Sequence, residues 1–272
     1  MKYVEVQGER VPALGFGTWQ LSGREAIEAV SHALELGYRH LDTAQMYRNE
    51  AQVGQALADS GLERGEVFLT TKLQPRNLDA DRVQRSTHES LERLQTDSVD
   101  LLLIHWPAFP SSMEATLEAM VNVREEGTVR HIGVSNFTPT LLREALEHAP
   151  IFCNQVEYHP YLAQPELRRI AVERDLLLTA YSPLAKGRVV NDEVLSEIGR
   201  RHGKTAAQVT LRWLVQQDHV AAIPRSGDRQ HRAANFDIFD FELSEEEMAR
   251  IEDLDRARRL IDPADLAPDW ER

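Results

Sequence analysis

Eight short apolar runs are spread along the chain, and stretches with helical periodicity separate them. Most of the runs are continuously apolar and do not alternate with polar residues, which is typical of strands covered on both faces in a parallel sheet. They predict strands near 14–16, 39–41, 67–71, 99–104, 129–134, 152–156, 176–180 and 221–224. The intervening stretches predict helices over 24–36, 49–59, 79–94, 113–126, 138–148, 164–174, 191–201 and 205–216.

Two further patterns lie outside this alternation. The opening segment alternates as YVEV, turns at QGE and continues as RVP, which predicts a small β-hairpin. Near the end, SEEEMARIEDLD predicts one more helix, with Ser244 and Glu247 in capping-box spacing. Because α/β barrels of roughly 250 residues commonly form one domain, we expect residues 1–272 to form a single (α/β)8 barrel of the TIM type. It would carry an N-terminal β-hairpin and a short C-terminal tail.

Polar residues follow directly after, or shortly after, three of the apolar runs. Asp42 and Tyr47 follow the run at 39–41, Lys72 follows the next run, and His105 follows the one after that. The spacing is 30 residues from Asp42 to Lys72 and 33 from Lys72 to His105. Since the C-terminal ends of the strands form the active face of such barrels, the four side chains are expected to lie close together.

These four residue types together suit the protonation of a carbonyl oxygen. A phenol with a pKa of about 10 is a reluctant acid, but a nearby ammonium favours the phenolate and eases release of the proton. A carboxylate would hold that ammonium in place, and a neutral imidazole could donate a hydrogen bond to the same oxygen. Tyr47, Lys72, Asp42 and His105 could fill these roles with no metal ion.

Each of the four also has a purely structural interpretation. Asp42 could cap the following turn, and Tyr47 could pack in a loop. Lys72 could be a solvated residue at a strand end, and His105 a hydrogen-bonded structural histidine. Their joint placement at successive strand ends favours the catalytic interpretation.

Composition narrows the classes of partner. With 31 Lys and Arg against 44 Asp and Glu, the net charge is −13, which argues against nucleic-acid or anionic-membrane binding. Cys153 is the only cysteine, so no intrachain disulfide is possible and a reducing compartment is expected. The start lacks the apolar core of a signal peptide, and no apolar run is long enough to span a membrane. We therefore expect a cytoplasmic protein.

Several longer motifs are similar to those of a known family. The segments LGFGTWQL, GYRHLDTAQMYRNEAQVGQAL, VFLTTKL, DLLLIHWP, IGVSNF, CNQVEYHPYL, AYSPLAKG and IPRS resemble the aldo-keto reductases, and within them the bacterial 2,5-diketo-D-gluconate reductases. The resemblance implies a monomeric barrel that binds NADPH without a Rossmann domain. The glycines at 15 and 17 agree with this, because the third glycine of a dinucleotide fingerprint is missing.

The resemblance also implies roles for particular residues. Asp42, Tyr47, Lys72 and His105 match the family's catalytic tetrad, in which Tyr47 would be the general acid and His105 would orient the carbonyl. The matching cofactor residues are Ser135, Asn136 and Gln155 for the nicotinamide carboxamide, Tyr181 for ring stacking, Ser182 to Leu184 on the pyrophosphate side, Arg225 and Ser226 for the 2′-phosphate, and Asn235 for the adenine.

The chain departs from the family pattern in three ways: in the cofactor signature, at Gln74, and in the short segments after Trp106 and Trp270, where the larger relatives have longer loops. IPRS replaces the usual IPKS, and His231 and Ala234 stand where arginine and glutamate are usual. Because histidine is mostly neutral at pH 7, some use of NADH is expected beside NADPH. Gln74 replaces a common tryptophan, which predicts a wider, more polar substrate pocket beside Trp19 and Trp106.

The expected substrates are small polar carbonyl compounds, such as keto acids, methylglyoxal and sugar-derived ketones. Two alternatives stay open. One is a broad detoxifying aldehyde reductase, which differs only in its range of substrates. The other is a barrel that senses the cofactor without catalysis, against which the complete tetrad argues.

Overall fold

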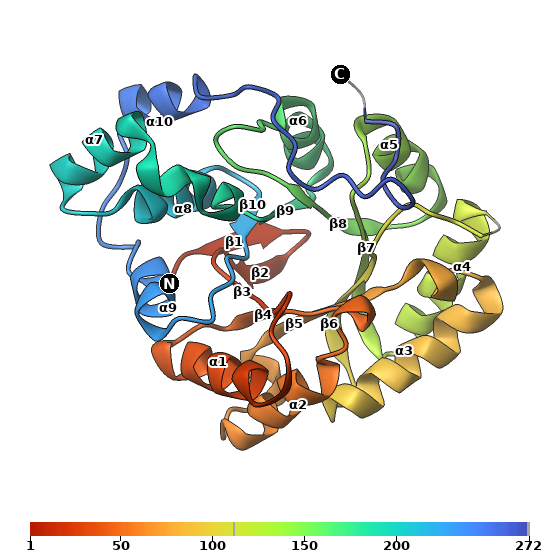
Figure 1. Cartoon of the computed structure of the whole chain (residues 1–272). Coiled ribbons are helices and arrows are strands. Elements are labelled where there is room, and N and C mark those ends of the chain that lie inside the picture. Colours follow the sequence, from red (N-terminus) through yellow and green to blue (C-terminus); the bar gives the residue numbers. More distant parts are fainter. Residues whose placement is uncertain (111, 271–272) are drawn as a thin grey trace.

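Eight parallel strands form the centre of the molecule, with helices around them (Figure 1). The structure is a computed structural model that describes residues 1–110 and 112–270. The spatial order of the strands, from β10 back to β3, follows their order in the chain. They are β3 (Phe16–Gly17), β4 (His40–Asp42), β5 (Phe68–Leu73), β6 (Val99–Ile104), β7 (Val129–Ser135), β8 (Ile151–Glu157), β9 (Leu177–Tyr181) and β10 (Val220–Ala222).

The two edge strands of this sheet meet and close it into a barrel. Leu14 and Ala222 form a parallel bridge. The amide of Gly15 donates to the carbonyl of Ala222 at 2.8 Å, and that of Gly17 to the carbonyl of Pro224 at 3.0 Å. Because β3 has only two residues, this seam between β3 and β10 is short. The predicted (α/β)8 barrel is confirmed.

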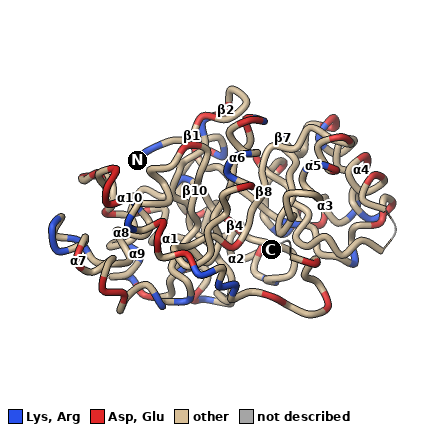
Figure 2. The backbone as a smooth tube through the Cα atoms, turned by 90° about the horizontal axis from the view of Figure 1, so that it is seen from above, with Lys and Arg blue, Asp and Glu red and all other residues tan. Residues whose placement is uncertain are grey.

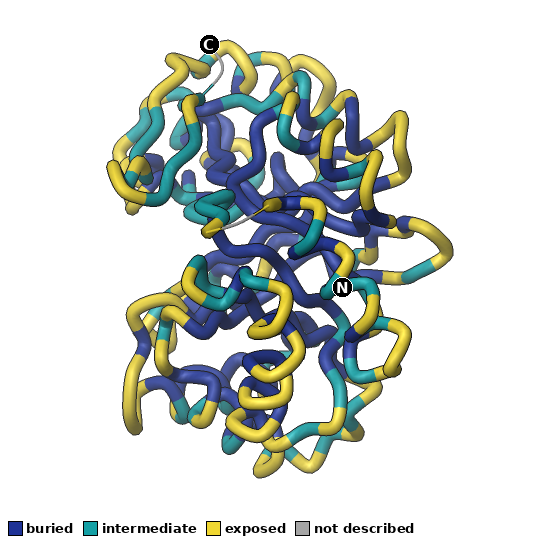
Figure 3. The backbone as a smooth tube through the Cα atoms, turned by 90° about the vertical axis from the view of Figure 1, so that its right-hand side faces the viewer, coloured by how far each residue is buried: buried dark blue, intermediate teal, exposed yellow. Residues whose placement is uncertain are grey.

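Helices lie outside the strands, as the periodicity predicted. In the view by burial the buried segments gather in the middle of the molecule, and the exposed ones follow its outer rim (Figure 3). The α-helices are α1 (Gly23–Leu36), α2 (Glu50–Asp59), α3 (Ala80–Leu94), α4 (Met113–Glu125), α5 (Pro139–His148), α6 (Pro165–Arg174), α7 (Glu193–His202), α8 (Ala206–Gln216), α9 (Arg229–Phe236) and α10 (Glu245–Glu252). Short 3₁₀ helices are η1 (Gln45–Tyr47), η2 (Arg64–Glu66), η3 (Pro75–Asn77) and η4 (Ala185–Asn191).

Helix α9 was not expected from the sequence. Its buried residues are the polar Arg232 and Asn235, so the apolar stripe that marks an amphipathic helix is missing. The side chain of Asp228 caps its start by accepting from the amide of His231 at 2.9 Å. Helix α9 is therefore stabilised by its cap and by tertiary contacts, which the sequence pattern does not reveal.

The expected hairpin and tail are also present. Strands β1 (Tyr3–Val6) and β2 (Glu9–Pro12) pair in antiparallel fashion. After α10, the chain runs back across the molecule toward α5 (Figure 1). The amides of Leu260 and Ile261 donate to the carboxylate of Glu157, each at 2.9 Å, and Nζ of Lys186 donates to the carbonyl of Leu260 at 3.1 Å. Glu157 is fully buried at the end of β8, so the tail is anchored at the C-terminal face of the barrel.

A close contact between α2 and α3 gives one testable prediction. A Cβ atom added at Gly54 would lie 2.4 Å from the backbone carbonyl of Leu94, whereas one added at Gly65 would meet nothing within 4 Å. Gly54→Ala should therefore lower the free energy of unfolding by about 1–3 kcal/mol, the usual cost of overpacking, in urea titration. Gly65→Ala is the matched control, and equal stability of the two variants would contradict the packing argument.

The tail anchor gives a second prediction. Glu157→Gln keeps the shape of the side chain but removes its negative charge and one of its two acceptor oxygens, so the charge-assisted bonds to the two tail amides become weaker neutral ones. Hydrogen exchange at Leu260 and Ile261 should become faster in this variant than in the parent protein. Glu252→Gln, which alters only an exposed ion pair with Arg168, is the control. Unchanged protection in Glu157→Gln would show that the carboxylate does not hold the tail.

Candidate active site

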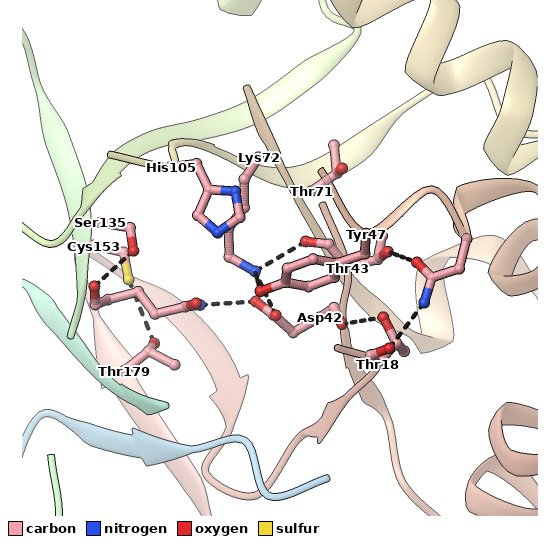
Figure 4. Close-up of polar contacts among 12 residues, drawn as sticks. Thr18, Asp42, Thr43, Tyr47, Thr71, Lys72, His105, Ser135, Cys153 and Thr179 are labelled. Carbon is pink, nitrogen blue, oxygen red and sulfur yellow. Dashed lines mark hydrogen bonds and ion pairs between the residues drawn. The ribbon is translucent and has the colours of Figure 1, made fainter. Parts of the chain in front are cut away.

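Four polar side chains converge at the C-terminal ends of β4, β5 and β6. Asp42 ends β4, Lys72 lies near the end of β5, and His105 directly follows β6. Nζ of Lys72 donates to Oδ1 of Asp42 at 2.5 Å and lies 3.4 Å from the hydroxyl of Tyr47 (Figure 4). The rings of Tyr47 and His105 meet edge to face, with centroids 5.4 Å apart. The structure thus brings together the four residues that the spacing pointed to.

Burial sets the protonation of this group. Burial lowers the pKa of Lys72, and the Asp42 carboxylate opposes that shift. Burial, and then the negative charge of Asp42, raises the pKa of Tyr47 well above its ordinary value. The sequence analysis expected the Lys72 ammonium to favour the phenolate, whereas burial and Asp42 shift the pKa of Tyr47 in the opposite direction.

His105 is held as a neutral imidazole. Burial, followed by the positive charge of Lys72, moves its pKa well below the usual value. Its Nδ1 atom is buried and has no hydrogen-bond partner within the described part of the chain. Its backbone carbonyl accepts from Nδ2 of Asn136 at 2.9 Å. The ring packs against those of Tyr47 and Trp106, and no hydrogen bond from the described residues engages its nitrogens.

The residues matched to the nicotinamide form one hydrogen-bonded network with the tetrad. Gln155 Nε2 donates to Oδ2 of Asp42 at 2.7 Å, and the Ser135 hydroxyl donates to the carbonyl of Gln155 at 2.8 Å. The Tyr181 hydroxyl donates to Oδ1 of Asn136 at 2.7 Å. Asn136 has a left-handed backbone with φ of 64°, a conformation that asparagine adopts more readily than most residues.

These side chains fit an amide-bearing aromatic ring such as nicotinamide. The Oε1 atom of Gln155 accepts no hydrogen bond from the described residues and could receive a carboxamide donor, while the Ser135 hydroxyl oxygen keeps a free lone pair. Both side-chain hydrogens of Asn136 are already engaged, by the carbonyl of His105 and the hydroxyl of Ser135. Asn136 is therefore better placed to fix Tyr181 and His105 than to bind the ring by itself.

The residues matched to the 2′-phosphate follow β10, on the side of the seam away from β4, β5 and β6, which carry the tetrad. Arg225 is exposed and its Nε donates to the carbonyl of Trp19 at 2.9 Å. Ser226 accepts from the amide of Asp228 at 3.1 Å. His231 is exposed, with Nδ1 4.0 Å from the Asp228 carboxylate. Asp228 therefore adds a negative charge beside the expected phosphate position.

Arg232 is a residue that the sequence analysis missed. It is buried, and its Nη1 donates to the carbonyl of Ser226 at 3.0 Å while its Nε donates to Nδ1 of His32 at 3.1 Å. Through the bond to Ser226 it fixes the loop that contains Arg225 and Ser226. Only its position after the IPRS motif could have drawn attention to it. Asn235, matched to the adenine contact, is buried on the same helix.

The remaining matched residues lie around the same face. Ser182 and Leu184 are half-buried in the segment after β9, where Ser182 has φ of 48°. Trp106 is buried, and its ring stacks on that of His105 with centroids 6.4 Å apart. Trp19 is 43% exposed in the loop after β3. Gln74 is half-buried after β5, and its amide donates to Oε1 of Gln45 at 3.0 Å.

The described residues contain neither a candidate metal cluster nor a candidate membrane-spanning helix. Within 1–110 and 112–270, no group of three or more His, Cys, Asp or Glu side chains could hold a metal ion. No helix in these ranges has the length and apolar character needed to cross a membrane.

Comparison with known proteins agrees with the motifs. The model of the Aldo/keto reductase family matches residues 13–256. Methylglyoxal reductase DkgB of Escherichia coli O157:H7 is 40% identical over 267 residues, which cover 96% of this chain and 99% of the relative. An aldo-keto reductase of Mycolicibacterium smegmatis is 41% identical over 256 residues, 93% of each chain.

A solved structure extends this likeness to three dimensions. A crystal structure described as a "putative 2,5-diketo-D-gluconic acid reductase B" is 48% identical, with a TM-score of 0.98. It covers 100% of this chain and 98% of its own. The resemblance drawn from the sequence is confirmed: the chain belongs to the aldo/keto reductase family.

Proposed function

We propose that this protein reduces small polar carbonyl compounds to alcohols with a nicotinamide cofactor, and that Tyr47 is the general acid. The observation that carries the proposal is the convergence of Tyr47, His105 and the buried Lys72–Asp42 pair at one point. A protonated phenol beside a neutral imidazole suits the protonation of an oxygen on which negative charge builds.

Each of the four residues has one role in the proposed reaction. His105 donates a hydrogen bond from its ring to the carbonyl oxygen and so orients it. Tyr47 transfers its proton to that oxygen, and the ammonium of Lys72 then stabilises the phenolate that is left. Asp42 keeps Lys72 charged and in place. The bound cofactor supplies the hydride for the carbonyl carbon.

Ser135, Gln155 and Tyr181 would hold the nicotinamide, with Asn136 fixing the ring of Tyr181. Ser182 and Leu184 would lie on the pyrophosphate side, and Asn235 near the adenine. Arg225 and Ser226 would receive the 2′-phosphate of NADPH. Because His231 is a weak cation and Asp228 is acidic, we infer a preference for NADPH small enough to permit use of NADH.

The substrate class is inferred from the pocket and from the relatives. Gln74 gives the pocket a polar wall where an aromatic ring is common, which favours small polar substrates. Relatives named for methylglyoxal and 2,5-diketo-D-gluconic acid support dicarbonyls and keto acids. A broad aldehyde reductase would instead accept apolar aldehydes equally well, so kcat/KM across a panel of purified carbonyl compounds separates the two functions.

The acid assignment gives a direct prediction. Tyr47→Phe should reduce NADPH consumption with methylglyoxal by at least about 100-fold, because general acid catalysis typically contributes 10²–10⁴-fold. Circular dichroism should show that the fold is unchanged. Tyr3→Phe, which removes the hydroxyl of an exposed tyrosine on β1, is the matched control. Full turnover by Tyr47→Phe would disprove the assignment.

The inferred cofactor preference gives a further testable prediction. His231→Arg should raise the ratio of kcat/KM for NADPH over NADH by about tenfold, since a hydrogen bond to a charged group is worth about 1.5–3 kcal/mol. Asp228→Asn should move the ratio in the same direction by removing a repulsive charge. His88→Arg, the same replacement on α3, should leave the ratio unchanged. A parent preference of many thousandfold would refute the inference.

A further inference from the structure

A cavity of about 570 Å³ opens between α2, α3 and the short helices η1 and η3, on the outside of the barrel. Its floor includes the buried Gln45, Glu50 and Ser86. Within the described chain, Tyr47, Lys72 and His105 are not among its lining residues. The cavity is therefore separate from the carbonyl-reducing site, although Gln74 borders both.

The cavity is positively charged in a negatively charged protein. Charges of both signs are spread over the outer helices and loops (Figure 2). The cavity wall, in contrast, has a net charge of +3, from five arginines and two glutamates, whereas the whole chain has −13. A concave surface lined by one sign of charge concentrates counter-ions. The five arginines are Arg48, Arg76, Arg82, Arg85 and Arg93.

Most of this positive charge is not neutralised by the protein. Arg93 is paired with the Glu50 carboxylate at 2.8 Å, and Arg82 lies 3.9 Å from a carboxylate oxygen of Asp79. Arg48, Arg76 and Arg85, in contrast, have no side-chain ion pair or hydrogen bond to any residue in 1–110 or 112–270. Three guanidinium groups thus line one cavity with their donors unused, and such groups bind oxyanions through paired N–H donors.

The cavity wall is also rigid. Gln45 Nε2 donates to the carbonyl of Ser86 at 3.0 Å and to the hydroxyl of Ser90 at 3.1 Å. Its Oε1 accepts from the amide of Gln74 and, at 2.9 Å, from Nδ2 of Asn77. These four bonds tie η1 to η3 and α3, so the backbone segments that carry the arginines are held in a fixed arrangement. An ordered backbone loses less entropy when a ligand binds.

Arg48 adds a feature of the backbone. It has φ of 56° and ψ of 31°, the left-handed conformation that glycine or asparagine adopts at lower cost. An exposed arginine in this strained position contributes its guanidinium to the cavity directly after Tyr47. Strain of this kind concentrates at functional sites.

From these features we propose that the cavity is a binding site for a small polyanion with about three negative charges, distinct from the cofactor and carbonyl substrate. Its volume lies within the range of about 300–1,000 Å³ that is usual for small-molecule sites. Pyrophosphate and citrate both match the charge, the first through phosphate and the second through carboxylate oxygens. The negative charge of the whole chain would repel a long nucleic acid and favours a small anion as the occupant.

The experiment is calorimetric titration of the full chain, without cofactor, with pyrophosphate and separately with citrate. The test variant is Arg76→Gln combined with Arg85→Gln. The matched control combines Arg174→Gln with Arg200→Gln, exposed residues at the ends of α6 and α7, which change the net charge equally. We expect at least one anion to bind the parent and control proteins alike and the test variant at least tenfold more weakly.

The two titrants also identify the chemistry, because the one whose affinity depends on Arg76 and Arg85 names the preferred oxyanion. Equal affinity for the test variant and the parent would overturn the proposal, as would failure of both anions to bind. A further variant, Arg225→Gln, monitors the expected cofactor site. If it alone abolished binding, the anion would occupy that site and the proposal would be wrong. Since no step measures turnover, the outcome is independent of the proposed reductase activity.

Discussion

The ion pair between Asp42 and Lys72 is the interaction on which the centre of the barrel depends. Both side chains are buried, with 2% and 0% of their surfaces exposed, and an unpaired ammonium in such a place would cost several kcal/mol. Lys72 also donates to the carbonyl of Thr43 at 2.9 Å, and Gln155 binds the second oxygen of Asp42. The pair therefore joins β4, β5 and β8 across the interior, and its charges are satisfied only when these strands are in register.

The same pair determines the state of the two rings beside it. Asp42 helps to keep Tyr47 protonated, and Lys72 helps to keep His105 neutral, while burial drives both effects. Two opposite charges thus give two uncharged groups that can donate hydrogen bonds to the same oxygen. In the proposed reaction, this arrangement would let a site with no net charge stabilise a developing oxyanion.

Much of the barrel could be predicted because its strands are continuous apolar runs and its helices show clear periodicity. The convergence of Asp42, Lys72 and His105 followed from one topological rule about strand ends. The direction of the pKa of Tyr47 could not be predicted, because it depends on burial and on which oxygen Lys72 binds. Helix α9 was missed because its buried face is polar.

Long-range contacts were equally beyond the sequence. Glu157 binds the amides of Leu260 and Ile261, which lie more than a hundred residues later. The arginine-lined cavity likewise joins residues from η1, η3 and α3 whose unpaired state depends on where every carboxylate lies. No local pattern in the chain records either arrangement.

The short seam between β3 and β10 has a consequence for how the protein fluctuates. Local opening of a native protein begins where few backbone hydrogen bonds must break together, and the two-residue β3 is such a place. The contact of Arg225 with the carbonyl of Trp19 bridges this seam near the face that carries the site. A molecule that contacts both Trp19 and Arg225 would therefore hold the two sides of the seam together. Its binding would favour the closed seam over the locally opened one.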